Sequence, residues 1–187
     1  MIATTYSLLK EKTRYLQAFF ANPRAFGSIA PSSSALCRTM SEAVDWQQTQ
    51  RIAELGAGDG VLTRHLLHRM KADATLAAYE INPHLAHKLN AFNDLRLTVR
   101  TDSAETLDTG YDAIFSGLPL LSLPQALRER ILTQISRALT PGGVFVQFQY
   151  TSLSEPLLSQ HFYWTRTRVM RNLPPAYVYR CQAAAHH

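Results

Sequence analysis

A glycine-rich turn supplies the first residues whose types and spacing suggest chemistry. Gly56, Gly58 and Gly60 occupy every second position after the apolar run 51–55, which contains Glu54. Glycine lets a backbone turn tightly and come close to a ligand. The register is G-x-G-x-G, whereas a turn that holds a pyrophosphate at a helix N-terminus reads G-x-G-x-x-G. The turn either binds a ligand other than a pyrophosphate or only joins a strand to a helix.

A carboxylate follows at the end of the next apolar run. Glu80 stands 20 residues past Gly60, where it can accept two hydrogen bonds from the hydroxyls of a ribose. That arrangement serves NAD and S-adenosylmethionine alike. The glycine spacing distinguishes the two cofactors, because it is not the register that binds the pyrophosphate of NAD. Asp59 also adds a negative charge, which would repel a pyrophosphate but not a sulfonium with an amino group. These residues therefore favour S-adenosylmethionine.

Alternating strands and helices are expected to position these residues. Repeated strand and helix units imply a parallel sheet with helices on both faces. In such a sheet ligands bind beyond the carboxyl ends of the strands, where the glycine turn and Glu80 fall. The sequence predicts strands at 51–55, 75–80, 95–99, 111–116 and 142–150, and helices at 61–70, from Pro83, and at 125–139.

The last part of the chain has no room for another crossover helix. After a short helix near 153–160, strands are predicted near 161–169 and 176–181, on either side of the break at 173–175. They should pair as an antiparallel hairpin on the sheet edge. The expected fold class is thus α/β, a single Rossmann-like domain with a mostly parallel seven-stranded sheet and a C-terminal antiparallel edge hairpin.

An amphipathic helix is predicted over residues 5–20, before the sheet begins. Its aromatic-rich apolar stripe suits either the core of the domain or a membrane surface, and periodicity does not choose between them. A loop over 27–34 follows, and its last serines can cap a helix near 34–44. We assign residues 1–45 to this N-terminal part and 46–187 to the core, within one domain overall.

Composition and charge narrow the class of protein further. The 187 residues are 46% hydrophobic and 18% charged, which excludes a disordered or collagen-like chain. No apolar run is long enough to span a bilayer. Cys37 and Cys181 lack the spacing of metal ligands, so we expect two reduced thiols and no metal site. Both observations lead us to expect a cytoplasmic protein. Residues 1–40 and 156–187 carry +4 each and the centre −3, for a net +5. Two basic ends suit the phosphates of nucleic acid or of an anionic membrane.

The motifs resemble those of the class I S-adenosylmethionine-dependent methyltransferases, and the match runs through the whole chain. The resemblance implies that Glu54 and the three glycines surround the methionine part of the cofactor. It also implies that Glu80 binds the ribose. The resemblance further implies that Ile81 packs against the adenine and that Asp102 and Ser103 lie beside the adenine amino group. Ser116 corresponds to the start of the family's motif after the fourth strand.

The motif after the fourth strand also bears on the substrate. Many amine and adenine methyltransferases of this class have Asn or Asp there, then Pro, then an aromatic residue. This chain reads Ser116-Gly117-Leu118-Pro119-Leu120. With neither an amide acceptor nor a stacking ring, the segment disfavours adenine N6 chemistry and weighs against RNA.

Three separated segments resemble the bacterial phospholipid N-methyltransferases more closely. They are residues 26–33 (FGSIAPSS), 116–122 (SGLPLLS) and 172–179 (NLPPAYVY). The resemblance implies methylation of a lipid amine of the phosphatidylethanolamine or ornithine-lipid type. It further implies that Ser32 and Ser33 close over the cofactor carboxylate rather than only cap a helix. By the same resemblance, the N-terminal helix binds the anionic inner face of the membrane as a peripheral anchor, and no nucleic acid is expected as a partner.

Few catalytic groups are needed for such a reaction, because methyl transfer requires alignment, exclusion of water and a neutral amine. Tyr150, at the end of the fifth strand, and Tyr177, after the proline break, are our candidates for contacting the amine; packing at the sheet edge is the other interpretation of each. The alternative function is a soluble methyltransferase that acts on RNA or a small-molecule amine. An inactive binding module is disfavoured because every cofactor position is intact.

Overall fold

A seven-stranded sheet organises the chain, and the computed structural model describes residues 33–183 of it. The strand order is β3-β2-β1-β4-β5-β7-β6. The first five strands along the chain pair in parallel, and β7 pairs antiparallel with both β5 and β6, which confirms the predicted fold class. The strands are β1 (Arg51–Leu55), β2 (Thr75–Tyr79), β3 (Leu97–Arg100), β4 (Tyr111–Ser116), β5 (Leu139–Gln149), β6 (Phe162–Val169) and β7 (Ala176–Ala183).

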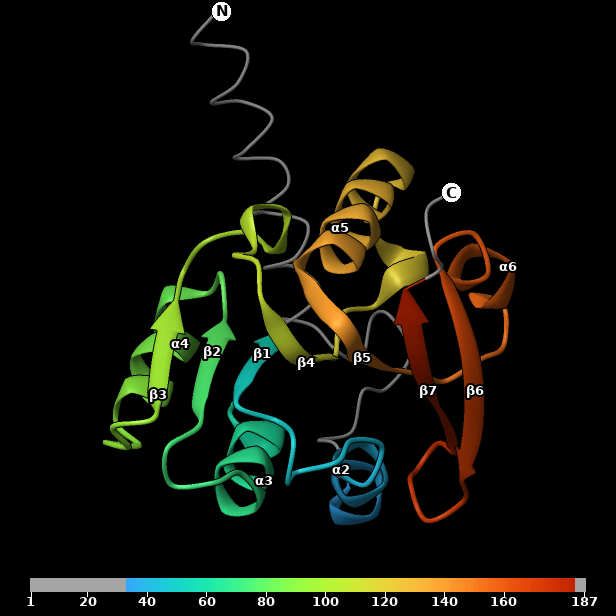
Figure 1. The fold of residues 1–187 in the computed structure, drawn as a ribbon. Coiled ribbons are helices and arrows are strands. Elements are labelled where there is room, and N and C mark those ends of the chain that lie inside the picture. Colours follow the sequence, from blue (N-terminus) through green and yellow to red (C-terminus); the bar gives the residue numbers. More distant parts are fainter. Residues whose placement is uncertain (1–32, 184–187) are drawn as a thin grey trace, which may run out of the picture.

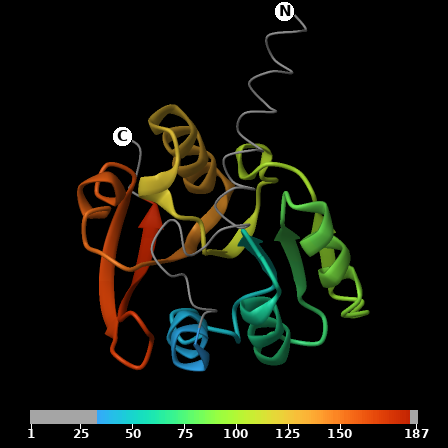
Figure 2. The same cartoon turned by 180° about the vertical axis from the view of Figure 1, so that it is seen from behind.

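Helices cover both faces of the sheet, with α5 on one side and α2 and α3 on the other (Figures 1 and 2). Each face has its own hydrophobic core because successive strand residues point to opposite sides. In β4, Ile114 belongs to the core that contains Leu132 of α5, whereas Phe115 belongs to the core that contains Leu36 of α2. The helices are α2 (Ser34–Ser41), α3 (Val61–Arg69), α4 (Pro83–Asn90), α5 (Gln125–Ala138) and α6 (Glu155–Leu158), with 3-10 turns η2 (Ala104–Thr106) and η3 (Leu120–Ser122).

Local chemistry accounts for where the helices begin and end. Asn82 caps α4, because its side chain accepts from the backbone N–H groups of His84 and Leu85 and Pro83 takes the first position. Helix α2 ends at Ser41, earlier than the 34–44 predicted. The Trp46 indole donates to the Ser41 carbonyl at 2.7 Å, so a side chain takes a bond that the next turn of helix would have used.

Strand β5 begins earlier than the sequence predicted. It starts at Leu139 rather than near residue 142, and its register with β4 shifts between Tyr111 and Ala113. Gly142 absorbs this irregularity with a φ of +81°, a conformation that favours glycine. The predicted amphipathic helix at 5–20 and the residues up to Ser32 lie outside the described part of the chain. Within residues 33–183, no helix is long and apolar enough to cross a bilayer.

Candidate active site

The glycine turn leaves the sheet at the end of β1 and is fastened to the end of β2. The backbone N–H groups of Gly56 and Ala57 both donate to the Tyr79 carbonyl, at 2.9 and 3.2 Å. Gly56, Gly58 and Gly60 all have positive φ values, of 73°, 59° and 82°. A Cβ on Gly58 would have no neighbour closer than 4.0 Å, so the turn leaves open space at its centre for a ligand.

Glu80 holds the glycine turn and the start of α4 together. Its Oε2 accepts from the Gly58 N–H at 2.8 Å, and its Oε1 accepts from the Asn82 N–H at 2.7 Å. The side chain is buried, and burial raises its pKa. Each carboxylate oxygen can accept a second hydrogen bond, so these backbone contacts leave acceptor capacity for ribose hydroxyls.

Glu54 lies under the same turn, on the side of the sheet that α2 and α3 cover. It is 2% exposed, and its Oε2 accepts from the Thr63 hydroxyl at 2.7 Å. Burial, with a smaller contribution from the negative charges of Glu80 and Asp59, raises the pKa of this carboxyl to about 8, although the hydrogen bond from Thr63 opposes the shift. Among residues 33–183, neither Glu54 nor Glu80 has an ion-pair partner. A cationic ligand in the turn would stabilise both in their charged form.

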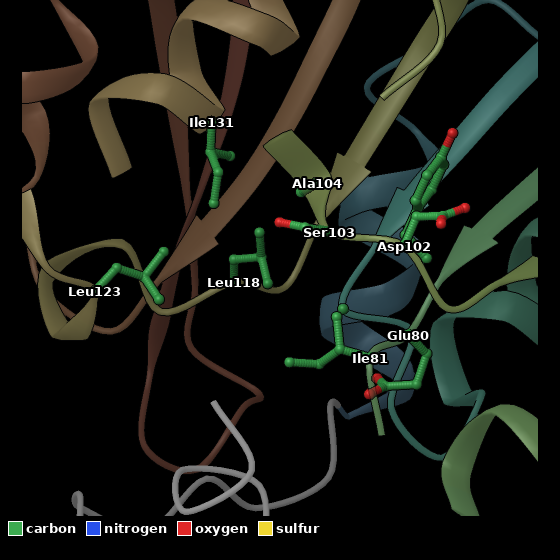
Figure 3. A pocket seen from close by; sticks show the side chains of 10 residues that line it. Glu80, Ile81, Asp102, Ser103, Ala104, Leu118, Leu123 and Ile131 are labelled. Carbon is green, nitrogen blue, oxygen red and sulfur yellow. The ribbon is translucent and has the colours of Figure 1, made fainter. Parts of the chain in front are cut away.

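A pocket that is partly open to solvent extends from the turn between β2, β3 and α5. Figure 3 shows Glu80 and Ile81 on one side of it, Leu118, Leu123 and Ile131 on the other, and the segment 102–104 between. Five of the predicted site residues line this pocket. They are Gly56, Glu80, Ile81, Asp102 and Ser103.

Two of these residues already have partners within the chain. Asp102 is exposed and pairs with Arg100 at 3.1 Å. The Ser103 hydroxyl accepts from the Glu105 N–H at 3.3 Å and caps η2. Leu118, Leu123 and Ile131 form the apolar wall opposite. Leu118 lies in the predicted motif after β4, but Leu123 and Ile131 were not predicted as part of the site, because leucine and isoleucine in helices and turns are equally typical of ordinary core.

The segment after β4 is held against the glycine turn and against β5. The Ser116 hydroxyl accepts from the Leu118 N–H at 3.2 Å, and the Gly117 N–H donates to the Leu55 carbonyl at 3.1 Å. The Leu118 carbonyl accepts from the side-chain amides of both Gln147 and Gln149, each at 3.1 Å. These glutamines were missed, although two polar residues in an otherwise apolar strand were a usable signal.

Gln147 ends in a buried oxygen, Oε1, that has no hydrogen-bond partner among residues 33–183. Its Nε2 donates to the carbonyls of Leu118 and Phe148, which fixes the amide orientation and leaves Oε1 as the unpaired atom. Buried polar atoms are normally hydrogen-bonded, so an unpaired acceptor beside the segment 116–118 stands out. An N–H donor such as an amine would satisfy it.

The two predicted amine contacts are not brought together. Tyr150 packs with Phe148 on the α2 face of the sheet, at a ring distance of 5.7 Å, whereas Tyr177 packs on the α5 face. The guanidinium groups of Arg166 and Arg168 lie over the Tyr177 ring, at 4.9 and 5.7 Å from its centre. Tyr177 already has cations over its ring, so Tyr150 is the better candidate.

Ser33 and Asn172 connect the start of α2 to the turn between β6 and β7. The Ser33 hydroxyl caps α2 by accepting from the Leu36 N–H at 3.1 Å, which confirms the predicted serine cap. The Ser33 N–H donates to the Asn172 Oδ1 at 3.1 Å. Ser32 lies outside the described residues. No cluster of metal-binding side chains occurs within residues 33–183.

Comparison with known proteins decides the family. Residues 52–143 match the model of a methyltransferase domain. The chain is also 30% identical over 186 residues to the ornithine lipid N-methyltransferase of Singulisphaera acidiphila, covering 93% of this chain and 97% of that protein. The chain belongs to the class I S-adenosylmethionine-dependent methyltransferases.

Solved structures share the fold of this methyltransferase. The 1,6-didemethyltoxoflavin N1-methyltransferase of Burkholderia thailandensis, solved with S-adenosylhomocysteine, has a TM-score of 0.72 at 17% identity, over 94% of this chain and 90% of its own. The N-methyltransferase NodS of Bradyrhizobium japonicum, also with S-adenosylhomocysteine, has a TM-score of 0.68 at 12% identity, over 92% and 98%. The cofactor of this methyltransferase is S-adenosylmethionine. The open glycine turn and the carboxyl groups of Glu54 and Glu80, which have no ion-pair partner among residues 33–183, fit that cation.

Proposed function

We propose that this methyltransferase transfers methyl groups to the amine head group of a membrane lipid of the phosphatidylethanolamine or ornithine-lipid type. The observation that carries the proposal is the 30% identity to an ornithine lipid N-methyltransferase, which extends over 97% of that protein's length. The likeness therefore extends well beyond residues 52–143, the part that matches the general methyltransferase domain.

The residues at the acceptor end of the site support an amine substrate. The chemistry supplied by bound S-adenosylmethionine is a methyl group on a sulfonium, so the chain itself has to orient an amine, keep it neutral and exclude water. Gln147 and Gln149 hold the segment 116–118 in place, and the unpaired Gln147 Oε1 can accept from an N–H. These groups are polar and uncharged, and burial among them favours the neutral form of an amine.

Tyr150 is the side chain that we place against the amine. Burial raises the pKa of its phenol, so at neutral pH it keeps its proton and serves as a hydrogen-bonding partner rather than as a base. Glu54 and Glu80 hold the cationic cofactor from below the glycine turn, with Asp102, Ser103 and Ile81 around its nucleoside part. Ser32, Ser33 and Ser116 remain proposed cofactor contacts.

A lipid substrate also implies a location. We place the protein at the inner face of the cytoplasmic membrane as a peripheral protein, with residues 5–20 and their basic neighbours Lys10, Lys12 and Arg14 against anionic lipid. Removal of residues 1–32 should then reduce binding to anionic vesicles. Unchanged binding by the truncated chain would refute this assignment.

The experiment that tests the proposed substrate compares lipids directly. Purified protein is incubated with S-adenosylmethionine and detergent-dispersed phosphatidylethanolamine, ornithine lipid or phosphatidylglycerol, and the lipids are examined by mass spectrometry. Gain of one or more methylene masses on an amine-bearing lipid, absent with Gly58→Arg, is the expected result. Lack of methylation of both amine lipids by protein that binds S-adenosylmethionine would refute the proposal.

A further inference from the structure

The turn between β6 and β7, residues 170–175, presents two apolar side chains on a fixed support. Met170 and Leu173 are 63% and 82% exposed. Asn172 between them is 3% exposed, and its Nδ2 donates to the Pro174 carbonyl at 2.7 Å while its Oδ1 accepts from the Ser33 N–H at 3.1 Å. The backbone is therefore anchored, and the two apolar side chains are held outward.

Unpaired positive charge flanks this apolar pair. Arg168 and Arg171 are exposed, and neither has an ion-pair partner within residues 33–183. The two other hairpin arginines bind acceptors within the chain, because Arg166 pairs with Glu155 and the Arg180 Nε donates to the Ala43 carbonyl at 2.9 Å. Arg168 lies over the Tyr177 ring, a contact that leaves its N–H groups free to donate to a phosphate. The chain contains no Asp or Glu after Glu155. Apolar side chains between unpaired arginines suit the interface of an anionic bilayer, where the chains insert and the guanidinium groups meet phosphates.

The turn also lies at the acceptor end of the candidate site. Gln149, the last residue of β5, is opposite Tyr177 in β7, which is opposite Arg168 in β6. The turn therefore continues beyond the carboxyl end of β5, next to Tyr150, and its neighbour in space is the start of α2 (Figures 1 and 2). Asp102, at the nucleoside end of the pocket, follows β3 at the opposite end of the strand order.

We propose that residues 168–173 dock this protein on an anionic lipid surface, with Met170 and Leu173 in the interfacial layer and Arg168 and Arg171 on lipid phosphates. The inference rests on the proposed lipid substrate for its choice of a bilayer over an acidic protein surface. Docking at this turn brings head groups to the end of β5 where the acceptor amine has to bind.

Flotation with vesicles tests the docking surface without relying on catalysis. The full chain is mixed with vesicles of phosphatidylcholine alone or with phosphatidylglycerol, and the bound fraction is measured. Leu173→Glu should lower the affinity for anionic vesicles roughly tenfold, because it removes one inserted side chain and adds a negative charge. Arg171→Glu should reduce the preference for anionic over neutral vesicles.

A matched control is available at the opposite edge of the sheet. Leu95 is fully exposed and precedes β3 at the amino end of the parallel strands, so Leu95→Glu makes the same chemical change away from the turn. It should leave vesicle binding unchanged. S-adenosylmethionine affinity and the melting temperature of Leu173→Glu should equal those of the wild type, as should its methylation of detergent-dispersed lipid.

The outcomes separate the docking surface from the proposed substrate. Equal vesicle affinity of Leu173→Glu and the wild type would overturn the docking surface, even if lipid is methylated. So would failure of the wild type to bind anionic vesicles, the result expected if the turn contacts a protein instead. Weaker vesicle binding by Leu173→Glu but not by Leu95→Glu would support the docking surface. If the wild type then methylates no lipid, only the proposed substrate is refuted.

Discussion

Replacing Glu54 with Gln should remove a large pH dependence from the stability of the protein. In the folded chain burial raises the pKa of this carboxyl from 4.5 to about 8. Between these two values the unfolded chain releases the proton while the folded chain keeps it, so stability falls as pH rises from about 4.5 to about 8 and is then constant. At about 1.4 kcal/mol for each pKa unit, the total loss is on the order of 5 kcal/mol.

Glutamine cannot ionise, and its amide oxygen can still accept from the Thr63 hydroxyl. The difference in unfolding free energy between Glu54→Gln and the wild type should therefore shift in favour of the variant by several kcal/mol between pH 5 and pH 8. Urea denaturation of the cofactor-free proteins at pH 5, 6.5 and 8 measures it. Glu42→Gln, which removes an exposed carboxylate, controls for the loss of one charge. Parallel pH profiles for Glu54→Gln and the wild type would refute the reasoning.

Binding of S-adenosylmethionine gives a second measure of the same charge. A cationic ligand stabilises the ionised carboxylate, so wild-type affinity should rise with pH until about pH 8, with release of a proton. Glu54→Gln should bind more weakly, and its affinity should change less over that range. Calorimetry in buffers of different ionisation enthalpy detects the proton directly. Binding without proton release at pH 7 would contradict the role assigned to Glu54.

Three further predictions concern the turn and the acceptor end. Gly60→Ala should lose about 2–4 kcal/mol of stability, measured by urea denaturation, since the new Cβ would come within 2.8 Å of Leu89 at a residue with positive φ. Gly142 has a similar φ but open space around it, so Gly142→Ala should lose only about 1 kcal/mol. Equal losses would contradict the steric argument. Gln149→Leu removes one donor to the Leu118 carbonyl and should lower kcat about tenfold with cofactor affinity unchanged, as measured by steady-state kinetics and calorimetry; unchanged kcat would contradict the role. Tyr150→Phe should lower kcat/KM up to about tenfold with an unshifted pH profile, because the phenol stays protonated; loss of a titration step would show that it acts as a base.

The fold could be predicted from the sequence because its patterns are local. The apolar run at 51–55, the glycine turn and Pro83 after Asn82 each identify an element by themselves. The position of β7 between β5 and β6 could not be predicted in the same way. Both strands of an edge hairpin alternate apolar and polar residues, so the pattern does not show which of the two pairs with β5. The early start of β5 was missed because Pro141 and Gly142 read as a loop and not as a bulged strand.

Candidate site residues could be predicted where they belong to a motif at the end of one strand. They could not be predicted where their role depends on contacts with an adjacent strand. The sequence places Glu80 and the glycine turn at strand ends, but the backbone N–H groups that Glu80 accepts from depend on how β1 and β2 lie together. Gln147 and Gln149 gain their role only because the Leu118 carbonyl lies beside β5. Tyr150 and Tyr177 look equivalent in the sequence, yet strand alternation places them on opposite faces.

The central claim is that the methyl acceptor is a lipid amine, and the fate of a labelled methyl group tests it most directly. Protein is incubated with methyl-labelled S-adenosylmethionine and cell extract that supplies lipid, RNA and small amines together, with Gly58→Arg as the inactive control. The account predicts label in the organic phase on a lipid that keeps its acyl chains. Label found only in RNA or in water-soluble amines would contradict it.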